Sequence, residues 1–170
     1  MRAGGRFHRL NHDVAVRHAN RPGADLVAEL REHAASRKLP IVTNYRNTLL
    51  DVMVHGQDVA IPLDRSMAVP VDAAAVGATR AWTMGWPFWA KHRLAGLRLS
   101  ATDVEWTVGH GADVRGPVLA LLLVLTGRPT ALRRLTGDGL PDLTARLTST
   151  TSTANNSLIE RRGRCDRSGK

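Results

Sequence analysis

The feature that most constrains this chain is an unbroken apolar run from Val118 to Leu125. Pro117 stands just before the run and Gly127 two residues after its end; proline is typical at the first position of a helix and glycine just past its last position. The run is far shorter than the ~20 residues that a membrane-spanning helix needs. Since hydrophobic residues make up 43% of the chain and charged residues 23%, the composition is typical of a globular protein. The run therefore predicts a short, very apolar helix in a globular fold and no membrane-spanning segment.

The net charge and the cysteine content argue against several further classes of protein. The net charge is +9, but the arginines are scattered, and residues 148–170 supply +3 of it through five basic and two acidic residues. Nucleic-acid binding is therefore disfavoured. The single cysteine, Cys165, excludes a disulfide framework and a cysteine-type zinc site. Because the N-terminal arginines are not followed by an apolar stretch, we expect no secretory signal and a cytoplasmic protein.

Apolar residues at helical spacing predict that the first half is helical. Pro22, Pro40 and Pro62 are expected to end the first three helices, Thr43 to cap the third, and Pro87 to kink the fourth. The expected helices are residues 6–20, 24–38, 44–59 and 72–94.

The pattern then changes to alternation, which predicts strands at 97–102 and 104–108 with a bulge or turn between them near Asp103. Residues 110–113 are expected to form a turn. Further short helices are expected at 117–126, 129–136 and 139–147.

The sequence thus predicts an α+β protein. We expect a helical domain over 1–64, a linker over 65–71, a C-terminal α+β domain over 72–147 and a disordered basic tail over 148–170. The apolar stripes of the first three helices need partners, which favours dimerisation or poor solubility.

The third helix carries the one arrangement with evident chemistry. Asp51 and His55 lie one turn apart in a polar stripe that also contains Asp58, with apolar residues on both flanks. If Arg46 and Gln57 mark the solvent side, the stripe faces inward, and a carboxylate and an imidazole at this spacing can bind one metal ion. The alternative is that the stripe is simply the solvated face of the helix.

A second pattern is a tryptophan stripe, Trp82, Trp86 and Trp89, at helical spacing in the fourth helix. Such a stripe is typical of a core or a domain seam. The functional alternative is an aromatic wall of a ligand pocket. We find no glycine-rich phosphate loop and no serine or cysteine hydrolase arrangement.

Residues 44–59, with the motif His55-Gly56-Gln57-Asp58, resemble the last bundle helix of the mycothiol-dependent maleylpyruvate isomerase family, which belongs to the DinB-like metalloproteins. Residues 96–103, Trp106, and the downstream Arg115-Gly116-Pro117 and Gly127-Arg128 are similar to the C-terminal domain of that family. The resemblance covers about residues 1–147.

The resemblance implies the remnant of an antiparallel four-helix bundle followed by a small α/β domain similar to sterol-carrier folds. It implies a divalent metal, typically zinc, bound by Asp51 and His55, with glutamate in place of Asp51 in the type enzyme. The third family ligand is a histidine on an earlier helix, which would precede Met1, so we expect a shortened chain that lacks this ligand; it is an enzyme if the metal site is completed in another way and inactive if it is not.

The implied reaction is a thiol-assisted cis–trans isomerisation with mycothiol as cofactor, or a transfer reaction. A small-molecule thiol and its substrate are the implied partners, with no membrane partner and a homodimer as one way to complete the protein. Arg98, Arg115 or Arg128 could hold substrate carboxylates, and the alternative for each is an ordinary surface arginine. A second hypothesis is a non-catalytic protein that binds a small ligand or a partner through its C-terminal domain.

Overall fold

The computed structural model describes residues 4–36, 38 and 44–149, without the side chains of residues 4–8, 10 and 11. Contacts divide the chain into two compact units, Met1–Pro40 and Ile41–Lys170. The domain expected over 1–64 is thus divided at residue 40, and its third helix lies in the second unit. The cap expected at Thr43 and residues 150–170 of the tail expected over 148–170 lie outside the described residues, and residues 148 and 149 belong to a helix.

The first unit contains α1 (Gly4–Ala19) and α2 (Gly23–His33), close to the expected positions. An ion pair between Arg21 and Glu29 joins the turn before α2 to the helix itself. No residue of α2 is buried, and Val27 and Leu30 are exposed. The apolar stripe of α2 is therefore not buried within its own unit.

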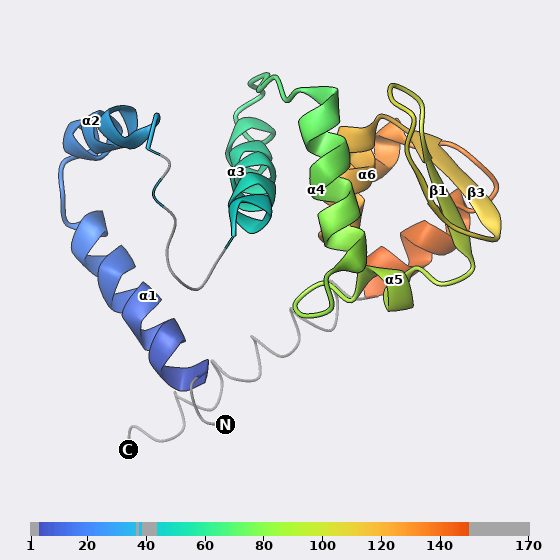
Figure 1. Cartoon of the computed structure of the whole chain (residues 1–170), viewed down its shortest axis with the longest axis horizontal. Coiled ribbons are helices and arrows are strands. Elements are labelled where there is room, and N and C mark those ends of the chain that lie inside the picture. Colours follow the sequence, from blue (N-terminus) through green and yellow to red (C-terminus); the bar gives the residue numbers. More distant parts are fainter. Residues whose placement is uncertain (1–3, 37, 39–43, 150–170) are drawn as a thin grey trace, which may run out of the picture. The chain divides into compact units, whose positions relative to one another are not determined.

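The second unit is built around α6 (Val118–Leu125), whose residues are buried apart from the half-buried Leu119. Helix α4 (Val71–Thr83) packs on α6, and α3 (Tyr45–Ala60) packs on α4. The sheet contacts α6 as well, so helices and strands share one core (Figure 1). Small residues allow α4 to approach both neighbours; a Cβ at Gly77 would lie 2.6 Å from the Met53 methyl carbon. The buried residues of α4 are Ala74, Gly77, Ala78 and Ala81.

Side chains from other parts of the chain form hydrogen bonds with the backbone at both ends of α6. Asp103 Oδ1 accepts a hydrogen bond from the Val118 backbone N–H at 2.8 Å. Arg93 Nη2 donates to the carbonyl oxygens of Val124 at 3.4 Å and Leu125 at 3.0 Å. Because helix ends carry backbone groups without intrahelical partners, these contacts make burial of the whole helix possible.

The sheet has three strands in the order β2-β1-β3, where β1 is Leu97–Ala101, β2 is Thr107–Gly109 and β3 is Ala112–Gly116. Strand β1 pairs antiparallel with β2 and parallel with β3. The prediction of a turn at 110–113 was wrong in its second half, since β3 begins at Ala112. Gly111 makes the tight connection; it has φ +117°, and a Cβ there would lie 2.0 Å from the Gly96 carbonyl oxygen.

The fourth expected helix, 72–94, is two separate helices. Helix α4 ends at Thr83 and α5 (Ala90–Arg93) follows after a turn that contains Pro87. The break, instead of the expected kink, separates Trp82 from Trp86 and Trp89, so the three tryptophans do not form one helical stripe. The C-terminal part contains a 3-10 helix, Pro129–Arg134, and a helix over 140–149.

These elements confirm a mixed α/β fold with several helices and one small sheet. The resemblance to a four-helix bundle and to sterol-carrier folds stays a prediction. Within the described part of the chain, no helix is both long enough and apolar enough to cross a membrane.

The buried position of α6 generates a first prediction. Leu122→Ala is expected to lower the free energy of unfolding by about 2–5 kcal/mol, because it leaves a cavity between α6 and α4. Urea denaturation followed by circular dichroism measures the change. Val59→Ala on the exposed side of α3 is the control and should change it by less than about 0.5 kcal/mol. Equal stability of the two variants would contradict the central role of α6.

Candidate functional site

The orientation of α3 decides which way its polar stripe faces. Leu50, Met53 and Val54 are buried against α4, and Gln57 is also buried, at 6% exposure. The Gln57 amide donates a hydrogen bond to the Met67 carbonyl oxygen at 3.0 Å. The premise that Gln57 marks the solvent side was therefore wrong, because its amide bonds the chain that returns toward α4.

Asp51 and His55 consequently lie on the exposed side of α3. The helix begins after Asn44, whose side-chain oxygen accepts a hydrogen bond from the Asn47 backbone N–H at 3.1 Å. The polar stripe is thus the outer face of α3 within its unit, flanked by the exposed apolar side chain of Val52.

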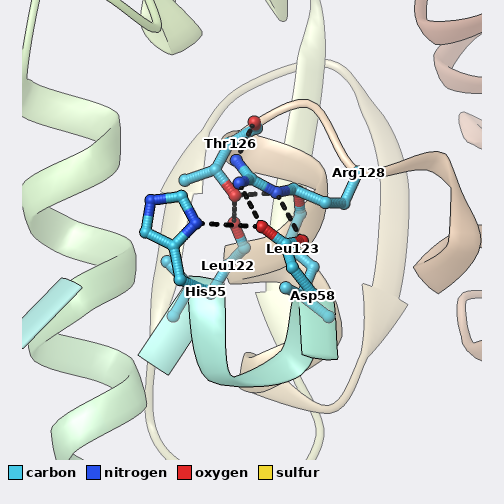
Figure 2. A network of polar contacts seen from close by, with 6 residues as sticks. All are labelled: His55, Asp58, Leu122, Leu123, Thr126 and Arg128. Atoms are coloured by element: carbon cyan, nitrogen blue, oxygen red, sulfur yellow. Dashed lines mark hydrogen bonds and ion pairs between the residues drawn. The ribbon is translucent and has the colours of Figure 1, made fainter. Parts of the chain in front are cut away.

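His55 belongs to a polar network that joins α3 to the end of α6 (Figure 2). Arg128 donates two hydrogen bonds to the Asp58 carboxylate, from Nε at 3.1 Å and from Nη2 at 2.7 Å. The other contact of Asp58 is the His55 ring, whose Nδ1 lies 3.1 Å from Asp58 Oδ2. The three side chains form a continuous chain from guanidinium to carboxylate to imidazole.

The C-terminal end of α6 holds Arg128 in place. Gly127 has φ +87° and turns the chain away from the helix, and the Arg128 backbone N–H donates to the Leu123 carbonyl oxygen at 2.8 Å. The guanidinium also donates from Nη1 to the Thr126 carbonyl oxygen at 2.8 Å. The Gly127-Arg128 pair is therefore a helix-ending turn that aims the guanidinium at α3.

The guanidinium of Arg128 is the main influence on the pKa of Asp58. Its hydrogen bonds lower the pKa of the Asp58 carboxyl below its ordinary value; partial burial opposes this, and the His55 contact adds to the lowering. An ionised carboxylate only accepts hydrogen bonds, so Nδ1 of His55 carries the proton that points to Asp58. In the neutral imidazole the lone pair is then on Nε2, and the side chain is 68% exposed.

The described residues contain no group of three or more His, Cys, Asp or Glu side chains that could hold a metal ion. Asp51 and His55 fit two positions of such a site, since they are one turn apart on the same exposed helix face. The carboxylate on Nδ1 of His55 is the arrangement that usually orients a metal-binding histidine. A complete site would need a further donor beyond these two.

A small hollow of about 210 Å³ adjoins the network. Its lining includes Asp58 and Arg128 and the apolar side chains of Ile61 and Pro62. The other two arginines considered as carboxylate clamps are paired with one aspartate: Asp113 Oδ2 lies 2.6 Å from Arg115 Nη2, and Asp113 Oδ1 lies 3.9 Å from Arg98 Nε. Of the three arginines, Arg128 alone lines this hollow.

Comparison with protein-family models, with curated proteins and with solved structures finds no match for this chain. The site therefore rests on its own geometry.

Sequence reasoning found His55 but missed its partnership with Asp58 and Arg128. The sequence contains both halves of this network as short motifs, His55-Gly56-Gln57-Asp58 and Gly127-Arg128. The contacting residues Asp58 and Arg128 are 70 positions apart in the chain. Only the packing of α3 and the end of α6 brings them together.

The ion pair generates a second prediction. Arg128→Gln is expected to raise the pKa of Asp58 toward the ordinary carboxyl value of 3.8, because the main cause of its lowering is removed. Carbon-detected NMR titration of the carboxyl group measures the change. A carboxyl pKa that is lowered in the folded state contributes stability at pH values above the unfolded value, and this contribution is lost as the pH falls through the folded value. Arg133→Gln, on an exposed arginine of the 3-10 helix, should leave the titration unchanged; an unchanged Asp58 titration in Arg128→Gln would exclude the pair.

Proposed function

We propose that this chain is a metal- and thiol-dependent enzyme of the mycothiol-dependent maleylpyruvate isomerase type, centred on His55 and Asp51. The observation that carries the proposal is the network Arg128–Asp58–His55. It orients the His55 imidazole, whose side chain is 68% exposed, and Asp51 lies one turn away on the same exposed helix face.

Each residue of the proposed site has a separate role. Asp51 and His55 would supply two metal ligands from one helix face. Asp58 acts as a positioning residue, because it holds the proton on Nδ1 of His55, and the two hydrogen bonds from Arg128 hold the Asp58 carboxylate in place. A bound zinc ion would lower the pKa of a cofactor thiol and so make a thiolate available at neutral pH.

The hollow beside the network is suited to a small substrate. It combines the charged pair Asp58 and Arg128 with apolar walls from Ile61 and Pro62. A cytoplasmic setting fits the proposal, since thiol cofactors are kept reduced there. A third donor would come from outside the described residues, from the thiol or from a second copy of the chain.

Metal content is the direct test. Purified protein is expected to hold close to one zinc ion per complete site by mass spectrometry, and His55→Ala and Asp51→Ala are expected to lose it. Asp58→Asn should weaken zinc binding by about 10-fold or more, because the imidazole loses its orienting carboxylate. Isomerase activity that depends on added thiol would then be measured in the zinc-loaded protein.

The matched control is His92→Ala, which removes an exposed histidine from a different element, α5. It should retain the zinc of the unchanged protein. The unchanged protein is purified without chelators and incubated with zinc. If it then holds no zinc, the proposed metal site is wrong.

A further inference from the structure

A second and larger hollow lies where α4 ends and α5 begins. It has a volume of about 470 Å³ and shares no lining residue with the hollow beside Arg128. Its apolar walls include Trp82, Met84 and Trp89, and its rim includes Lys91 and His92. We call it the tryptophan groove. Its size is sufficient for a small ring compound.

Trp89 is held in an unusual conformation at this groove. Its backbone has φ 48° and ψ 32°, the left-handed region that a large side chain rarely adopts. The Trp89 N–H donates to the Gly85 carbonyl oxygen at 2.7 Å, which closes the turn. Backbone strain of this kind is often found where a side chain is positioned for function.

Gly85 lies in contact with the indole ring of Trp89. A Cβ at Gly85 would lie 3.4 to 3.7 Å from three ring atoms of Trp89, so the ring lies close to the glycine backbone. The side chain nevertheless stays 59% exposed. A large aromatic surface that is positioned but not covered can serve as a stacking platform for a flat ligand.

The charge of the groove favours an anion. Lys91 and His92 both lie in α5 and both are exposed. Among the described residues that line the groove there is no aspartate or glutamate. An anionic group at the rim would therefore meet a cation and no competing carboxylate.

We propose that the tryptophan groove binds small aromatic carboxylates. The ring of the ligand stacks on Trp89 and contacts Trp82 and Met84, while its carboxylate lies toward Lys91 and His92. This site is independent of the metal ligands on α3, and it gives a specific form to the ligand-binding hypothesis that the tryptophan pattern raised.

The test compares two probes of the same shape, 2-naphthoate and the neutral 2-naphthamide, by isothermal titration calorimetry on the full chain. Naphthoate is expected to bind saturably and more tightly than the amide. Trp89→Asn should weaken naphthoate binding by about 10-fold or more, because the stacking surface is lost. Asparagine tolerates the left-handed backbone better than tryptophan does, so this variant is expected to fold.

Two further variants separate the site from general effects. Trp86→Ala removes an indole that is 73% exposed but does not line the groove, and it should leave binding unchanged. Lys91→Gln should weaken naphthoate binding by about threefold without changing the binding of naphthamide.

Each of the following results would overturn the proposal: no saturable naphthoate binding, equal affinity for the amide, or the same loss in Trp86→Ala as in Trp89→Asn. Should Trp89→Asn fail to fold by circular dichroism, the selective effect of Lys91→Gln decides. An equal loss for both probes in that variant would also exclude the groove as a carboxylate site. These outcomes do not depend on zinc, so they are distinct from failure of the metal site.

Discussion

Burial of α6 is the constraint on which the rest of the second unit depends. A helix that is apolar on all sides must be covered on all sides, and here α4, the sheet and the 3-10 helix share that role. Complete burial also requires partners for the free backbone groups at the helix ends. Asp103 at one end and Arg93 at the other supply them. The burial of Arg93 lowers its pKa, as expected for a cation that leaves water.

The candidate site is a consequence of the same arrangement. The chain leaves α6 at Gly127, and the turn aims Arg128 at the outer side of α3. Since α3 is fixed by its own packing on α4, the distance between Asp58 and Arg128 is set by two helix contacts and not by local sequence. The network in Figure 2 therefore joins the core to the exposed face that carries Asp51 and His55.

Sequence patterns located most helices because apolar spacing and prolines are local signals. They failed where the same local pattern is compatible with two structures, a turn or a strand in one case and one helix or two in the other. Strand β3 was missed because its charged residues, Asp113 and Arg115, and the glycines just before it and at its end are also typical of a turn. The helix expected over 72–94 is broken because the chain turns after Thr83 and again at the left-handed Trp89. The three tryptophans therefore do not form one helical stripe. Trp82 and Trp89 line a groove instead, and Trp86 does not.

The sequence by itself determined the mixed helix-and-strand fold, the apolar helix α6, and the placement of Asp51 and His55 on one helix face. Each of these follows from the spacing of neighbouring residues. Tertiary structure alone decided which side of α3 faces outward, because Gln57 could bond either water or the Met67 carbonyl oxygen. It also decided that Arg128 reaches Asp58. Such contacts join residues far apart in the chain, and their formation depends on how the helices pack rather than on any local pattern.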